Sequence, residues 1–399
     1  MGNLRRLRSR HDARPAGVRW SVARAALGVP VLLAAWGGFA LVTAHDASAS
    51  PQPGTAESHG TYLTFVAGAG TVNKVTLTRE SPSGAVLLSD TGNPIAFAPA
   101  SDGTCTKLDA DTVRCPASLS KVEIHLQDGN DTFHTGLGVY TVIHGSDGDD
   151  VLEGGNGGGE IHGGAGKDSI YGGDIRDVVR GGAGDDTIIG GGGNDDLSGQ
   201  SGRDEIHGGD GEDRIDGGAD KDNVYGDNGK DDLRSTDVDD NQYGGPGDDT
   251  LGSGIDVLGQ DGDDRVVMTE SVGEYWGGPG SDVIDYAEWG GVLNVSLDGN
   301  SNDGGSGADC DDWIGCPVAP RHNVHGDFEH VIGTPFNDKI SGNNEADILD
   351  GGAGSDRLYG NGGNDYLDAQ GGANQRTEGG AGYDTCVGFG VTARPGCEE

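Results

Sequence analysis

The sequence predicts an all-β protein built from short stacked strands, and three observations point to this fold class. Of the 399 residues 78 are Gly and only 33% are apolar, which is too little apolar material for one large globular core. From residue 145 onward, Gly, Asp and an aliphatic residue recur with a fixed period. Before that, residues 62–126 alternate apolar and polar side chains, as half-buried strands do. We therefore expect a small antiparallel β domain followed by two arrays of stacked repeats.

Residues 1–49 predict a secretory signal peptide. Arginines from Arg5 to Arg24 precede an uncharged run over residues 25–44, and the small residues 47–49 follow. An uncleaved anchor is the alternative, because this run could just span a bilayer, but the Gly and Pro within it weaken a stable span. We expect cleavage near Ala49, which changes the formal net charge from −40 to −45, and an extracellular location.

A short polar leader at residues 50–57 is expected to precede the antiparallel domain at residues 58–135. Apolar and polar residues alternate over 62–66, 75–78 and 122–126, and Gly or Pro separates these runs.

Residues 136–285 contain the main repeat array. Asp lies on a nine-residue grid at 150, 168, 177, 186, 195, 204, 213, 222, 231, 240 and 249, and only Gly159 interrupts it. An aliphatic residue lies two positions after each grid position, except at Gln242. Gly lies two positions before most grid positions, and the exceptions are Ile175, Asp220 and Val238. A non-repetitive insert at residues 286–332 separates this array from a second one at 333–385, and residues 386–399 form a cap.

The six cysteines lie in local pairs, which in an exported chain favour disulfides. The expected pairs are Cys105 with Cys115, Cys310 with Cys316, and Cys386 with Cys397. Zinc is the competing interpretation, but no CxxC motif and no His at ligand spacing accompany these cysteines.

The repeat GGxGxDxUx, where U is aliphatic, resembles the calcium-binding nonapeptide of the RTX (repeats-in-toxin) family. It is continuous over residues 145–252 and looser over 259–285 and 333–368. The resemblance implies a right-handed parallel β-roll in which two nonapeptides make one coil, so that alternate grid aspartates line opposite edges. It also implies that multiple Ca²⁺ ions bind between successive turns.

Elementary chemistry supports calcium in these turns. Gly supplies the backbone conformations with positive φ that tight turns need. Carboxylates about 5 Å apart repel by roughly 3 kcal/mol at an effective dielectric of 20, so an empty stack is not expected to hold. Ca²⁺ accepts six to eight oxygen ligands, whereas transition metals prefer His or Cys, which the turns lack. A calcium-independent solenoid or a disordered linker is the alternative. The expected ligands are Asp150, Asp168, Asp177, Asp186, Asp195, Asp204, Asp213, Asp222, Asp231, Asp249, Asp264, Asp282, Asp338, Asp347, Asp356 and Asp365.

HExxH and GxSxG are absent, which argues against an RTX-type protease or lipase. His322, His325 and His330 form the one cluster suited to a transition metal, although a solvated loop explains them better. Trp276, Trp289 and Trp313 suggest either packing or a contact surface.

We therefore expect a secreted calcium-binding structural or interaction module and not an enzyme. The alternatives are a calcium-dependent adhesin that contacts an extracellular protein or glycan, and an enzyme whose active site lies in residues 58–135 or 286–332. The acidic charge would repel nucleic acid and anionic membranes, so neither is an expected partner.

Overall fold

The structure is a computed structural model that describes residues 53–98, 105–234, 237–269, 273–299, 322–372, 375–388 and 396–398. These residues belong to one compact unit, Ala49–Glu399. The predicted signal peptide at residues 1–49 and the Cys310–Cys316 pair lie outside the described residues. Every regular element within the described ranges is a β-strand, and no helix there is long and apolar enough to cross a membrane.

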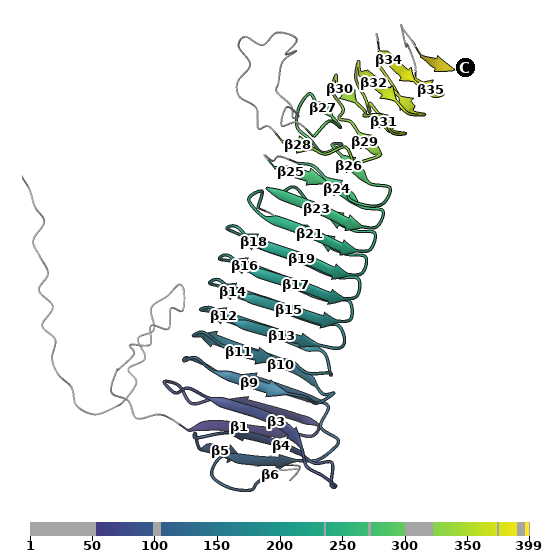
Figure 1. The fold of residues 1–399 in the computed structure, drawn as a ribbon. Helices are drawn as coiled ribbons and strands as arrows, with labels where there is room; N and C mark the ends of the chain where they lie inside the picture. The colour runs from purple at the N-terminus through teal and green to yellow at the C-terminus, as the bar shows by residue number, and fades with distance from the viewer. Residues whose placement is uncertain are drawn as a thin grey trace, which may run out of the picture. The chain divides into compact units, whose positions relative to one another are not determined.

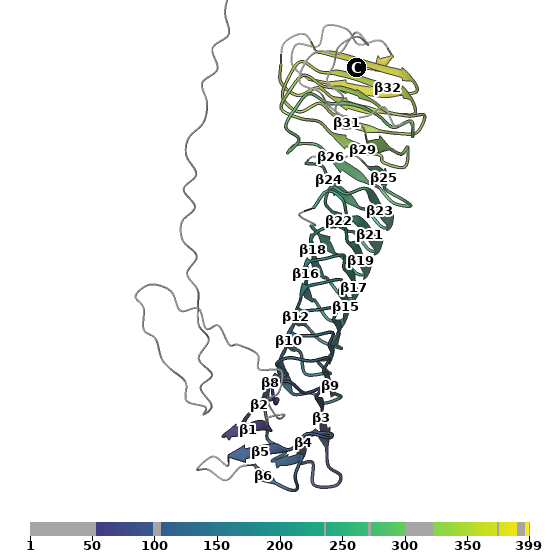
Figure 2. The same ribbon diagram turned by 90° about the vertical axis from the view of Figure 1, so that its left-hand side faces the viewer.

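Two long sheets face each other along the stack of coils, and a shorter third sheet follows the second (Figures 1 and 2). The first sheet contains β1 (Gly54–His59), β2 (Tyr62–Val66), β5 (Ile95–Ala98), β8 (Lys121–His125), β10 (Tyr140–Asp147), β12 (Gly159–Ala165), β14 (Asp177–Ala183), β16 (Asp196–Ser201), β18 (Arg214–Ala219), β20 (Asp232–Leu233), β22 (Thr250–Leu251), β24 (Arg265–Val267), β26 (Val283–Asp285), β29 (His330–Ile332), β31 (Ile348–Asp350), β33 (Tyr366–Asp368), β35 (Asp384–Val387) and β36 (Cys397–Glu398).

The second sheet contains β3 (Lys74–Arg79), β4 (Val86–Asp90), β6 (Thr106–Lys107), β7 (Thr112–Cys115), β9 (Thr132–Thr135), β11 (Val151–Glu153), β13 (Ser169–Gly173), β15 (Thr187–Gly192), β17 (Glu205–Asp210), β19 (Asn223–Asn228), β21 (Asn241–Pro246), β23 (Asp256–Asp261), β25 (Glu274–Trp276) and β28 (Asn323–Val324). The third contains β27 (Asn294–Ser296), β30 (Lys339–Ser341), β32 (Arg357–Gly362) and β34 (Arg376–Ala381).

The aliphatic residue of each repeat forms the core between the sheets. Parallel pairing places these side chains in register, for example Ile170 beside Ile188 and Val179 beside Leu197. All of them are almost completely buried. Because one aliphatic side chain per repeat cannot form a core alone, the stack buries these side chains together. They form two clusters, one that reaches Leu233 and one that begins at Leu251. This confirms the predicted all-β parallel roll.

Gln242 occupies an aliphatic position and is nevertheless buried. Its side-chain amide donates to the carbonyl of Ser253, and its Oε1 accepts from the backbone N–H of Gly252. These bonds satisfy a polar group that would otherwise destabilise the core.

The N-terminal segment contains the expected antiparallel hairpins, β1–β2 and β3–β4. However, β2 pairs in parallel with β8, which pairs in parallel with β10, and β9 joins β3 to β11 in the same way. Both sheets of the roll therefore begin inside residues 58–135. Residues 54–57 of the expected leader also belong to a strand, β1.

The insert does not interrupt the first sheet, because β26 pairs with β29 and β29 pairs with β31. On the other side β28 ends the second sheet, and β27 begins the third within the insert. The Cys105–Cys115 and Cys386–Cys397 disulfides are present as predicted. The latter lies where β35 pairs with β36 at the end of the first sheet.

Candidate metal centre

The grid aspartates form ladders along the two edges of the roll, as the two-repeat coil implies. In each ladder the backbone N–H of one Asp donates to Oδ1 of the Asp one coil later. Asp186 donates to Asp204 over 2.8 Å, and Asp204 donates to Asp222 over 2.7 Å. The first ladder runs through Asp131, Asp150, Asp168, Asp186, Asp204, Asp222 and Asp240.

The second ladder runs through Asp177, Asp195, Asp213, Asp231, Asp249, Asp264 and Asp282 and ends at Glu329. The coil between Asp249 and Asp264 is three residues shorter than the others, yet its hydrogen bond is kept. In the second array Asp338 bonds to Asp356, and a separate ladder links Asp347, Asp365 and Asp384. All predicted ligands are buried.

The second carboxylate oxygen of these residues is the chemically notable atom. Among the described residues no donor reaches Oδ2 of Asp131, Asp150, Asp168, Asp177, Asp186, Asp195, Asp204, Asp213, Asp222, Asp231, Asp249, Asp264, Asp282, Asp356, Asp365 or Asp384. Asp338 differs, because its Oδ2 accepts from the N–H and the hydroxyl of Thr334. A buried carboxylate oxygen without a partner is costly unless a cation satisfies it.

Burial shifts the protonation of these carboxyl groups. Loss of solvation raises the pKa of Asp186 to about 7 and that of Asp204 to about 6, from an ordinary value of 3.8. Neighbouring carboxylates add to the increase, and the hydrogen bond from the preceding Asp opposes it. Folding therefore disfavours the ionised form of these carboxyl groups, although the fold brings them close together.

Glycine keeps the space around these oxygens open. At Gly208 a Cβ would lie 2.5 Å from Oδ2 of Asp213 and 2.5 Å from the carbonyl oxygen of Gly226 in the next coil. A side chain would thus fill the place on which a carboxylate and a carbonyl oxygen converge. The same arrangement recurs at other turns, for example at Gly190 beside Asp195.

These donors fit a hard divalent cation. They are carboxylate and backbone oxygens from successive coils, the ligand type that Ca²⁺ prefers, and the turns contribute no imidazole or thiolate. The residues that would hold the ions are the grid aspartates and the backbone carbonyls opposite them. The bound ions would supply positive charge between carboxylates that otherwise repel.

Three members of the ladders, Asp131, Asp240 and Asp384, are not among the expected ligands. Asp240 lies on the grid in a repeat where Val238 replaces the turn glycine, and it is buried and accepts from the backbone N–H of Asp222. Asp131 and Asp384 lie one residue off the grid. Both follow Gly by two residues and precede a buried residue by two, namely Phe133 and Cys386. A local motif that accepts Phe or Cys at the aliphatic position would therefore have found them.

Gly159 interrupts the grid, so it contributes no carboxylate to the ladder that begins at Asp177. The end of the second ladder is also atypical, because Glu329 replaces Asp as the acceptor for Asp282.

The other candidate side chains do not form a metal site in the described residues. His322 is buried against Tyr286, whose hydroxyl lies 2.6 Å from its Nε2, and burial lowers the pKa of His322 to about 4. His325 contacts Glu274 and stacks on Trp276. Trp289 is buried, which fits packing rather than a contact surface, and Trp313 lies outside the described residues.

Changing Gly208 to Ala is expected to weaken calcium binding at its turn, because the new methyl group would occupy the oxygen-lined space. The calcium concentration at half-maximal β signal should rise by about threefold or more. Gly192→Ala is the matched control, since its Cβ would lie no closer than 3.4 Å to another group. Equal calcium midpoints for the two variants would contradict the assignment of this space to the ion.

Comparison with known families agrees with this geometry. The profile of the RTX calcium-binding nonapeptide repeat matches residues 144–174, 171–206, 198–233, 327–358 and 341–375. These segments contain much of both predicted arrays. No curated protein matches the chain as a relative. The aspartate ladders, the parallel roll and the repeated matches agree that residues 144–233 and 327–375 contain RTX-type calcium-binding nonapeptide repeats.

Proposed function

We propose that this chain is a secreted calcium-binding protein whose repeats fold into the β-roll when Ca²⁺ binds, and that it acts as a structural or interaction module. One observation carries the proposal: a long series of buried aspartates, each with an oxygen that no described donor satisfies. Because strands in a sheet are about 4.8 Å apart, these carboxylates cannot separate without breaking the stack.

Repulsion within the ladders makes folding depend on the cation. A pair of carboxylates at this spacing repels by roughly 3 kcal/mol at an effective dielectric of 20, whereas a whole domain is stable by only about 5–15 kcal/mol. An ion that binds the folded but not the unfolded chain shifts this balance by mass action. Sites of the extracellular type, with Kd on the order of 10⁻⁴–10⁻³ M, would stay empty inside a cell and fill outside it.

Secretion is part of the proposal and is supported by the sequence. The signal-like residues 1–49 and the disulfides Cys105–Cys115 and Cys386–Cys397 both fit export to an oxidising compartment. Folding after export would let the chain cross the membrane expanded. The adhesin alternative depended on exposed aromatic residues, and the burial of Trp289 does not favour it.

Calcium is expected to convert residues 50–399 from an expanded chain into a β-rich one. The test is far-UV circular dichroism during titration with Ca²⁺, reversal with EDTA, and titration with Mg²⁺ as the control. We expect a cooperative and reversible gain of β signal with Ca²⁺, and little gain with Mg²⁺, because Mg²⁺ demands a tighter octahedral geometry. A chain that is fully folded in EDTA and indifferent to Ca²⁺ would refute the proposal.

A further inference from the structure

Three histidines line up on the outer face of the first sheet, outside the aspartate ladders. Parallel pairing places His125 of β8 beside His144 of β10, and His144 beside His162 of β12. Their rings are stacked, with centroids 4.7 Å and 4.9 Å apart and planes within 6° and 5° of parallel. The spacing follows from the separation of strands in a sheet. Each coil thus contributes one imidazole, and the backbone register holds the imidazoles of successive coils side by side.

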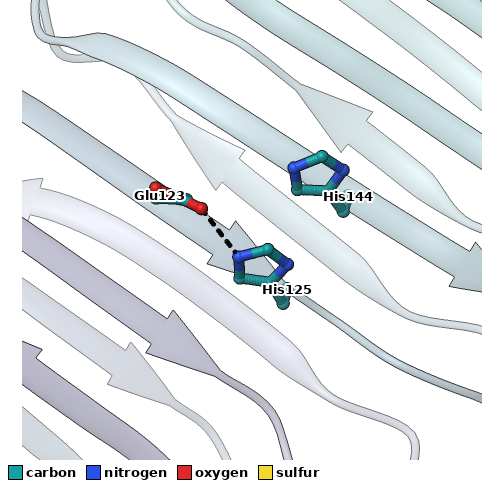
Figure 3. Close-up of side chains that lie close together, drawn as sticks. All are labelled: Glu123, His125 and His144. Carbon is teal, nitrogen blue, oxygen red and sulfur yellow. Dashed lines mark hydrogen bonds and ion pairs between the residues drawn. The ribbon is translucent and has the colours of Figure 1, made fainter.

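A carboxylate completes this group at its N-terminal end. Glu123 precedes His125 by two residues, so both side chains project from the same face of β8. Glu123 Oε1 lies 3.0 Å from His125 Nε2. One ligand atom from each of Glu123, His125 and His144 lies within 4.8 Å of the other two (Figure 3).

The surroundings of this cluster leave it open to a cation. His144 is half-buried within the stack, so its ring is held beside His125 and Glu123. The Glu123 and His125 side chains are 32% and 30% exposed, which leaves a path from solvent. At the other end of the stack the cationic Arg180 lies beside His162 in the register of β12 and β14, whereas the carboxylate of Glu123 lies at this end.

We propose that Glu123, His125 and His144 form a binding site for a divalent transition-metal ion such as Zn²⁺, separate from the calcium sites of the repeats. Imidazole nitrogen with one carboxylate oxygen suits zinc, copper or nickel and does not suit Ca²⁺. Ligand bonds of about 2.0–2.2 Å require the three atoms to approach to about 3.4 Å of one another. Rotation of these partly exposed side chains would supply that movement, and water would complete the coordination.

The position of the site gives the ion a structural consequence. It would join β8, which precedes the nine-residue grid, to β10, the first strand of the main array. A bound ion therefore links the N-terminal strands to the first coil and stabilises that junction in the folded state.

Zinc binding to the full chain in excess Ca²⁺ tests this proposal, because the calcium sites are then filled and the roll is formed. Isothermal titration with ZnCl₂ at pH 7 should show one saturable site. Glu123→Gln, His125→Gln and His144→Gln should each weaken it by at least about tenfold, since even outer partners of metal ligands contribute about 10–100-fold in affinity.

His134→Gln is the matched control. His134 also contacts a glutamate, Glu153, but it lies on β9 of the second sheet and outside the cluster. Zinc affinity should be unchanged in this variant, and all variants should keep the calcium-dependent β signal. As a second readout, Cu²⁺ bound to the wild type should show electron paramagnetic coupling to two nitrogens, and to one nitrogen in His144→Gln. No saturable zinc site in the wild type, or a site that His144→Gln leaves unchanged, would overturn the proposal and leave calcium-driven folding unaffected.

Discussion

Acid is expected to replace calcium as the folding trigger. When the calcium-free protein is brought from about pH 7 to about pH 5, its β signal should rise toward that of the calcium-bound protein. The pKa values of Asp186, Asp222 and Asp231 are raised to about 7 in the folded state, from an ordinary value of 3.8, chiefly because burial removes their hydration. The folded state therefore binds protons more tightly than the unfolded chain.

The direction of the effect follows from that difference. A group whose folded pKa is raised contributes full stability below its unfolded pKa and loses that contribution as the pH rises through its folded pKa. The calcium-free roll should thus gain stability progressively between about pH 7 and about pH 4. A protonated Asp also becomes a donor. Its O–H could then satisfy the carbonyl that converges on the same space, such as Gly226 opposite Asp213.

The measurement is circular dichroism in EDTA as a function of pH, with sedimentation velocity to separate folding from aggregation near the isoelectric point of about 4.3. In saturating Ca²⁺ the dependence should reverse, because protons compete with the ion for the same oxygens. A calcium-free chain that stays unfolded at pH 5 would show that carboxylate charge is not what opposes folding.

The repeat array could be predicted from sequence because its period is strict and each position of the repeat has a single structural role. When two repeats make one coil, the nine-residue spacing of Asp168, Asp177 and Asp186 places alternate aspartates on opposite edges of the roll. Hydrogen bonds between aspartates 18 residues apart confirm this arrangement. The aliphatic position two residues later fixes the core. These features are local and repeated, so pattern reading finds them.

The N-terminal pairing could not be predicted in the same way. Alternation over 62–66 and 122–126 indicates half-buried strands, but it is identical for parallel and antiparallel neighbours. The parallel pairs β2–β8 and β3–β9 join strands separated by long and unequal connections. Asp131 was not predicted as a ligand for a related reason. The connection between Asp131 and Asp150 contains one extra residue, which places Asp131 off the nine-residue grid.

The cluster of Glu123, His125 and His144 shows the same limit. Glu123 and His125 are visible as an alternating pair in the sequence, but the third side chain comes from another strand. Its place beside His125 depends on the register between β8 and β10, and no periodic motif covers the connection between them. A site made by cross-strand register is found only when that register is known.

The effect of Asp186→Asn on the stability of the roll is expected to have opposite signs with and without calcium. This substitution is therefore the sharpest test of the ladder. The variant keeps the acceptor for the N–H of Asp168 but removes the charge and the free Oδ2. In Ca²⁺ the loss of a charged ligand should raise the calcium midpoint by about three- to tenfold and reduce cooperativity. In EDTA the same substitution should stabilise the roll by about 1 kcal/mol, because it removes a buried charge and supplies a donor for a nearby carbonyl.

The adjacent Asp185 provides a control with the same change in net charge. Its side chain is 48% exposed and contacts Arg203, and its Oδ1 accepts from the backbone N–H of that residue. Asp185→Asn keeps that acceptor, so its effect in both conditions should be small, as is usual for exposed pairs. If the two variants behaved alike, the effect would come from overall charge. A sign reversal confined to Asp186 would instead locate the calcium dependence in the buried carboxylates, and would explain why a chain so rich in acid also forms a closely stacked β-roll.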